Sequence, residues 1–280
     1  MSNRPEPVTA ELLRSWGLPD PGDSKKARGD VVVVGGSRSA PGAVLLAGEA
    51  ALRVGAGRVA LVVPASIDAQ VGVALPEAGV FALPDRADDP LPAALAGRIA
   101  SADAVLVGPG FTDPDETRAT LRTVADAGAQ RVVLDAYALG VFPDVPRRSL
   151  PDELILSPNR EELQILLGRD PGDETDDVRE AAREHEAVVG CYGTVADPDG
   201  RTWLVDEGGA GLGTSGSGDV LAGAIAGFAA RGMPLHRAVV WGAWTHAVAG
   251  LRLTDRIGLG FLARDLTAEL TPTVRDTLRA

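Results

Sequence analysis

The chain has 280 residues and a formal net charge of −12 at pH 7, and 45% of its residues are hydrophobic but only 4% aromatic. The negative charge argues against a general nucleic-acid binder or a protein of acidic membranes, although a local set of backbone N–H groups can still hold an anion. Small aliphatic side chains suit a doubly wound sheet better than a β-sandwich, and one domain over residues 1–280 has room for a substantial core.

The predicted elements alternate between strands and helices. Residues 1–29 are polar and rich in Pro, Gly and charge, so we expect an extension along the edge of the domain. A strand at 30–34, a helix at 41–54 and a strand at 58–63 then form a βαβ unit. The pattern recurs with strands at 103–107, 131–134 and 154–156 and with helices at 114–127 and 160–167.

The last third of the chain has a different pattern. Asp197-Pro198-Asp199-Gly200 separates two apolar runs within 186–205 and predicts a hairpin, and helices dominate from Asp219 onward. Together the elements predict a three-layer α/β/α domain with a mainly parallel central sheet. The polar N-terminus and the lack of an apolar run of membrane-spanning length favour a cytoplasmic protein that binds no membrane.

Residues 211–223, GLGTSGSGDVLAG, contain five glycines and one carboxylate, Asp219, and an apolar helical pattern follows. Glycine lets the backbone approach a ligand closely, and free N–H groups at the start of a helix favour negative charge. The segment fits a phosphate site, and it fits equally a flexible loop in which Asp219 is an ordinary helix cap.

Small and polar residues also follow the predicted strands, where ligands bind in open α/β sheets. Each has a simple structural explanation as a turn or a helix cap, but their common position favours a ligand site and makes Asp135 a candidate. Arg38, in the loop after the first strand, fits a contact to a substrate phosphate and a solvated side chain equally well. The strand-end residues are Gly35-Gly36-Ser37, Gly108-Pro109-Gly110, Asp135 and Ser157-Pro158-Asn159.

The cysteine and histidine content restricts the chemistry further. Cys191 is the only cysteine, which excludes an intrachain disulfide, and its apolar neighbours favour inert packing over a nucleophile. The three histidines lie far apart and match no spacing of metal ligands. His246 lies in a largely apolar helical stretch, where a hydrogen-bonded core histidine is favoured over a catalytic one.

Five segments carry a resemblance to a known family: GGSRSAPGAVLLAGEAALRVGAGRVALVVP, VGPGF, LDAYALG, LSPNREELQILLG and GLGTSGSGDVLAGAIAG. Over about residues 29–270 the chain resembles the ADP-dependent NAD(P)H-hydrate dehydratases, which have a ribokinase-like fold. The resemblance implies a nucleotide-repair lyase that phosphorylates a ring hydroxyl of the S-epimer of hydrated NADH or NADPH, with ADP or ATP as donor, and then releases phosphate. It also implies Mg²⁺, a homo-oligomer such as a tetramer, and a separate NAD(P)H-hydrate epimerase as functional partner.

The resemblance also implies roles for individual residues. Asp219 would be the catalytic base, and the N–H groups of Gly216, Ser217 and Gly218 would hold the transferring phosphoryl group. The hydrated dinucleotide would contact Ala43, Gly110, Asn159 and Asp219, and the adenine nucleotide would contact Gly190, Cys191, Tyr192, Gly193, Thr194 and Gly218. The chain departs from the family where many relatives have Lys-Gly at Gly190-Cys191, histidine at Asn159 and aspartate at Tyr137, and the absent lysine leaves the choice between ADP and ATP open.

Two other functions fit part of the pattern. A ribokinase-like kinase for a vitamin precursor or a sugar would use the same Asp219 and the same glycine loop, but the match outside the loop favours the dehydratase. A non-catalytic sensor of adenine nucleotides fits the absent lysine and conflicts with the intact GSGD sequence.

Overall fold

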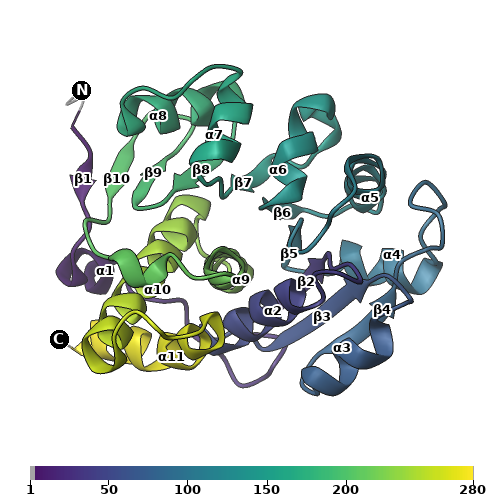
Figure 1. Cartoon of the computed structure of the whole chain (residues 1–280), viewed down its shortest axis with the longest axis horizontal. Coiled ribbons are helices and arrows are strands. Elements are labelled where there is room, and N and C mark those ends of the chain that lie inside the picture. Colours follow the sequence, from purple (N-terminus) through teal and green to yellow (C-terminus); the bar gives the residue numbers. More distant parts are fainter. Residues whose placement is uncertain (1–3, 280) are drawn as a thin grey trace.

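The computed structural model describes residues 4–279, whose ten strands form a single sheet in the order β1-β10-β9-β8-β7-β6-β5-β2-β3-β4 (Figure 1). Neighbouring strands are parallel except for the β8–β9 and β9–β10 pairs, so the prediction of a mainly parallel sheet is confirmed. The strands are β1 (Glu6–Pro7), β2 (Asp30–Val34), β3 (Arg58–Val63), β4 (Gly79–Ala82), β5 (Ala104–Val107), β6 (Arg131–Leu134), β7 (Glu153–Leu156), β8 (Val188–Cys191), β9 (Thr194–Ala196) and β10 (Thr202–Leu204).

Helices cover both faces of the sheet, because the central strands are apolar on both sides. In β2, Val31 and Val33 belong to one buried core, and Val32 and Val34 belong to the other. The first core also holds side chains of α1 (Ala10–Trp16), α2 (Gly42–Arg53), α3 (Asp68–Ala74), α9 (Ser217–Ala230), α10 (Leu235–Ile257) and α11 (Ala263–Arg279). The second core holds side chains of α4 (Ala93–Ala100), α5 (Pro114–Asp126), α6 (Tyr137–Val141), α7 (Arg160–Leu167) and α8 (Glu174–Glu184), which completes the predicted three layers.

Helices α9 and α2 pack against each other with their backbones in contact. A Cβ atom at Gly223 would overlap the carbonyl oxygen of Ala47, and one at Gly227 would lie 2.5 Å from the Val54 side chain. Glycine is therefore required at both positions of α9. This contact fixes α9, which carries Asp219 in its first turn, against the helix that follows β2.

Several elements differ from the sequence prediction. The N-terminal extension contains β1, which pairs with β10 at one edge of the sheet, and α1, whose Leu13 is fully buried. The prediction also lacked α3, β4, α4 and α8. Of these, β4 is a short edge strand whose residues are all partly or fully exposed. The hairpin at Asp197–Gly200 is confirmed, with Ala196 paired to Thr202 across β9 and β10. Within residues 4–279, no helix has the length and apolar character needed to cross a bilayer.

Candidate active site

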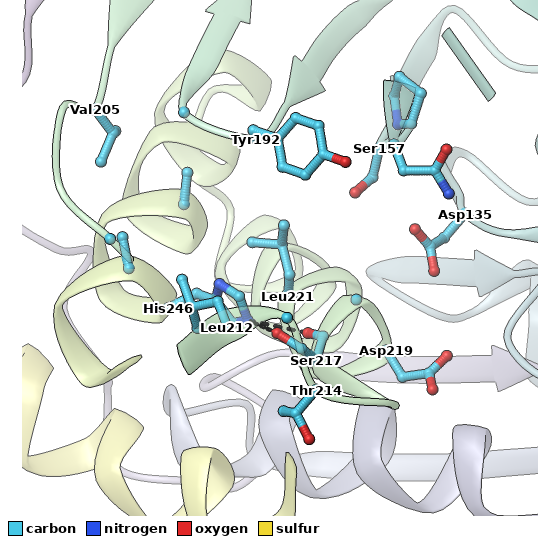
Figure 2. Close-up of a pocket in the computed structure, with 18 of the residues that line it drawn as sticks. Asp135, Ser157, Tyr192, Val205, Leu212, Thr214, Ser217, Asp219, Leu221 and His246 are labelled. Atoms are coloured by element: carbon cyan, nitrogen blue, oxygen red, sulfur yellow. Dashed lines mark hydrogen bonds between the residues drawn. The ribbon is translucent and has the colours of Figure 1, made fainter. Parts of the chain in front are cut away.

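A cavity of about 650 Å³ lies at the carboxyl ends of β6, β7 and β8, and the start of α9 and one face of α10 close it (Figure 2). Figure 2 shows Asp135 and Asp219 toward one end of this cavity and Val205 toward the other. The two ends differ in chemistry, because carboxylates surround the first and aliphatic side chains surround the second. We call this space the first cavity.

Asp219 lies in the first turn of α9, half-buried at the acidic end of the first cavity. Burial raises the pKa of its carboxyl group from the ordinary 3.8 to about 6. A carboxylate with this pKa is largely ionised at neutral pH and accepts a proton more readily than an exposed aspartate. Asp219 is therefore suited to act as a general base.

The glycine loop before Asp219 leaves backbone N–H groups open to a ligand. Gly216 has a φ of 88°, and its carbonyl accepts the first helical bond, from Val220 N–H at 3.2 Å. The N–H group of Ser217 donates to the Thr214 carbonyl at 3.1 Å, whereas those of Gly218 and Asp219 have no acceptor among the described residues. Two N–H groups at the positive end of a helix dipole thus remain for an anion.

His246 of α10 holds the start of α9 in place. Its Nε2 atom lies 3.0 Å from the Ser217 carbonyl oxygen and 2.9 Å from Ser217 Oγ (Figure 2). Burial lowers the pKa of this histidine to about 4, so it is neutral at pH 7. Because a carbonyl oxygen only accepts hydrogen bonds, Nε2 carries the ring proton and donates a hydrogen bond to the Ser217 carbonyl. The histidine lines the first cavity, and its contacts with Ser217 connect α10 to the start of α9.

Asp135 and Glu162 form an acidic wall beside Asp219. Burial raises the pKa of Asp135 well above its ordinary value, and the negative charges of Glu162 and Asp219 raise it further. The Ala136 N–H and the Ser157 hydroxyl donate hydrogen bonds that partly oppose this effect. Burial also raises the pKa of Glu162. The sequence placed Asp135 at this end of the sheet, and the structure adds Glu162 beside it.

Asn159 combines a structural role with a place in the first cavity. Its side chain accepts from the Glu162 N–H at 2.9 Å, while its own N–H donates to Glu162 Oε2 at 2.9 Å. These two bonds form a capping box at the start of α7. The capping explanation that the sequence left open therefore holds, and it does not remove the side-chain amide from the cavity lining.

Away from Asp219, the first cavity offers an apolar surface with one exposed aromatic ring. Tyr192, in the turn between β8 and β9, is 56% exposed and has a positive φ of 50°. The Arg160 guanidinium lies over its ring, 5.6 Å from the centroid. Across the cavity lie Val205, Leu212 and Leu221. A flat, partly apolar ligand fits between the ring and these side chains.

The predicted nucleotide segment divides between the cavity and the core. Tyr192 and Gly193 line the first cavity, whereas Gly190, Cys191 and Thr194 are buried in β8 and β9. A Cβ at Gly190 would lie 2.5 Å from Val239 Cγ1, and the Thr194 hydroxyl donates to Glu174 at 2.8 Å. Burial raises the pKa of the Cys191 thiol to about 12, in line with inert packing.

The predicted substrate residues also divide. Asn159 and Asp219 line the first cavity, as do Gly216, Ser217 and Gly218 of the loop. Ala43 and Gly110 lie against each other outside it, near the ends of β2 and β5. Arg38 lines a second, smaller cavity on that side of the sheet.

Two acidic residues of the lining were missed by sequence reasoning. Glu162 had a visible signal, because Asn-x-x-Glu at a helix start is a capping box that fixes the carboxylate near the strand end. Glu207 had none, since it follows β10 in an irregular segment that only the fold brings to the cavity.

A glycine-rich helix start with a raised-pKa carboxylate, at the carboxyl edge of a mainly parallel sheet, is the site of an α/β enzyme that holds an anion beside a proton acceptor. A model of the NAD(P)H-hydrate dehydratase family matches residues 31–272, and the chain belongs to this family. It is 42% identical to the ADP-dependent (S)-NAD(P)H-hydrate dehydratase of Xanthomonas campestris, over 97% of this chain and 96% of that protein.

Solved structures agree with the fold. The ADP/ATP-dependent NAD(P)H-hydrate dehydratase of Bacillus subtilis, co-crystallised with ATP and Mg²⁺, is 26% identical with a TM-score of 0.83, over 98% of each chain. A ribokinase-like superfamily protein of Enterococcus faecalis has a TM-score of 0.85 at 21% identity, over 98% of this chain and 97% of that one. The expectation of a ribokinase-like fold is thereby confirmed.

Proposed function

We propose that this chain dehydrates the S-epimer of hydrated NADH or NADPH with ADP as the phosphoryl donor. The observation that carries the proposal is Asp219 at the open start of α9, in a chain that belongs to the dehydratase family. Water is a poor leaving group from the hydrated ring and phosphate is a good one. A phosphoryl donor therefore makes the elimination possible.

The reaction has two stages. Asp219 takes the proton of the ring hydroxyl while the hydroxyl oxygen attacks the terminal phosphorus of ADP, and AMP leaves. The bond between the ring carbon and the phosphorylated oxygen then breaks as the ring nitrogen donates its electron pair, and phosphate leaves. Loss of a proton from the neighbouring ring carbon restores the double bond of reduced nicotinamide. The products are AMP, phosphate and NADH or NADPH.

The open N–H groups of Gly218 and Asp219 stabilise the phosphoryl group during transfer. They point from the positive end of a helix and need no reorganisation when charge develops. The Ser217 N–H already has the Thr214 carbonyl as its acceptor, so we assign the anion contact to Gly218 and Asp219 in place of the predicted Gly216, Ser217 and Gly218. His246 is a positioning residue for this loop.

The adenine base of the donor occupies the apolar end of the first cavity. There the ring of Tyr192 offers a stacking face, and Val205, Leu212 and Leu221 complete the apolar surface. Of the predicted nucleotide segment, Gly190, Cys191 and Thr194 serve by holding the hairpin in shape. The missing lysine is thus replaced by stacking and by contacts to the backbone.

A Mg²⁺ ion fits the acidic wall. Residues 4–279 contain no cluster of three or more His, Cys, Asp or Glu side chains that would form a complete metal cage. Mg²⁺ usually takes only one or two carboxylates, together with phosphate oxygens and waters. Asp135 and Glu162 would hold the ion, which would offset the charge of the nucleotide beside these carboxylates.

The test uses purified protein, chemically hydrated NADH, ADP and Mg²⁺. We expect the absorbance of reduced nicotinamide to return, with one AMP formed for each NADH, and Asp219→Asn to abolish both signals. Asp199→Asn, in the exposed hairpin, is the matched control and should act as wild type. Accumulation of a stable phosphorylated product without NADH would instead indicate a kinase, and nucleotide binding without turnover would indicate a sensor.

A further inference from the structure

A second cavity, of about 350 Å³, lies at the carboxyl ends of β2, β3, β4 and β5. In the sheet these strands lie on the side of β6 that faces away from β8 and β9, so the two cavities occupy opposite halves of one sheet edge (Figure 1). The walls of the second cavity come from the loops after these strands, including Arg38, Pro64, Leu83 and Phe111.

The boundary between the two cavities is built from closely packed glycine loops. Gly36 N–H donates to the Pro109 carbonyl at 2.7 Å, which joins the loop after β2 to the loop after β5. Gly110 has a φ of 77°, and a Cβ there would lie 2.5 Å from the Ala40 carbonyl oxygen and 3.0 Å from the Ala43 side chain. These contacts hold the two loops together, so a ligand that reaches both cavities passes over the glycines and not between the loops.

The proposed reaction needs more space than the first cavity provides. Phosphoryl transfer requires ADP and the hydrated dinucleotide at once, which together contain three nucleotide units. A volume of about 650 Å³ is typical of a cavity for one drug-sized ligand. In-line transfer also places the acceptor opposite the donor across the phosphoryl group. With ADP toward Tyr192, the substrate must extend past Asp219 toward β5 and β2.

The second cavity has the chemistry of a nucleotide site. Phe111, Leu83 and Pro64 are half-buried and form apolar walls of a size suited to a base. Asp85 and Glu116 also line it and can accept hydrogen bonds from an amino group or from ribose hydroxyls.

Arg38 supplies the positive charge in this region. No lysine or arginine is found among the described residues that line the first cavity, and Arg38 is the sole one lining the second. Within residues 4–279 its guanidinium is paired with no carboxylate, whereas the nearby Arg86 is paired with Asp88 at 3.1 Å. An unpaired guanidinium at the mouth of an otherwise acidic site favours a phosphate group of the ligand.

We infer that the second cavity binds the adenylate half of the hydrated dinucleotide, with Phe111 against the base and Arg38 on a phosphate. The inference rests on the proposed function and adds to it a site for the part of the substrate that does not react. Binding energy from that remote half holds the hydrated ring beside Asp219.

The test compares hydrated NADH with hydrated reduced nicotinamide mononucleotide, which lacks the adenylate half. We expect wild-type kcat/KM to be at least about tenfold higher for the dinucleotide, and Arg38→Gln and Phe111→Leu each to lower that value about tenfold. Both variants should leave kcat/KM for the mononucleotide within about twofold of wild type. Arg86→Gln, which removes a neighbouring charge outside the cavity, should change neither.

The possible results separate the two proposals. An equal loss on both substrates, or an unchanged preference in both variants, would overturn the inference while the dehydratase function stands. Equal wild-type turnover of both substrates would overturn it as well. If the wild-type protein dehydrated neither substrate with ADP or ATP, the proposed function itself would fall. Matching circular dichroism spectra and urea midpoints would show that each variant is folded.

Discussion

Replacing Asp219 by asparagine should make the protein inactive and more stable at the same time. Burial raises the pKa of Asp219 from 3.8 to about 6, which corresponds to about 3 kcal/mol of differential stability. Because the folded-state pKa is the higher one, the stability that the neutral carboxyl contributes is complete below about pH 4 and is lost as pH rises through about 6. The amide stays neutral throughout. At about pH 8, Asp219→Asn should therefore gain up to about 3 kcal/mol over wild type, relative to their difference at acid pH.

Two measurements on the same samples test this reasoning. Urea unfolding between about pH 4 and pH 8 should show the variant gaining stability over wild type as pH rises through about 6, while the exposed control Asp199→Asn shows no such trend. Steady-state turnover of hydrated NADH should fall by about 10²–10⁴-fold in Asp219→Asn, the usual loss for a general base. A stability difference independent of pH would refute the argument that burial destabilises the carboxylate. Retained turnover would refute its role as the base.

Four further predictions follow from the same geometry. The kcat/KM of the wild-type enzyme should rise with pH through about 6, as Asp219 loses its proton, and a profile that falls over this range would contradict a carboxylate base. His246→Phe should lower the free energy of unfolding in urea by about 1–3 kcal/mol, because it leaves buried Ser217 groups without a partner. Tyr192→Ala should raise the KM for ADP about tenfold while Tyr192→Phe stays near wild type, and equal effects would exclude stacking. Removal of Mg²⁺ with a chelator should stop AMP formation, and added Mg²⁺ should restore it; turnover that survives chelation would contradict a metal at Asp135.

Local sequence pattern predicted the central part of the fold well. The strand at 30–34 and the helix after it have strong, unbroken apolar patterns, and the structure places β2 and α2 there. Where contacts between distant segments decide the structure, local pattern failed. β1 consists of Glu6 and Pro7, which become a strand only by pairing with β10 about 200 residues later. Helix α8 is so rich in charge that its buried stripe around Val178 is hard to see in the sequence.

The candidate site shows the same division. Asp135, Asn159 and Asp219 each follow a recognisable strand end or helix start, so the rule that ligands bind at the carboxyl ends of parallel strands is enough to bring them together. The exposure of Tyr192 depends on the turn that β8 and β9 make, and the place of Glu207 depends on a loop with no regular structure. Sequence alone contains no signal for either.

The close contact of α9 with α2 determines which parts of the enzyme can move. Since Gly223 and Gly227 press the two backbones together, Asp219 and Ala43, each in the first turn of one of these helices, belong to one rigid body. Substrate entry and product release then involve no movement of Asp219 relative to Ala43. The exposed segments at the mouth of the first cavity, the Tyr192–Gly193 turn and the loop at 206–209, lie outside this rigid body.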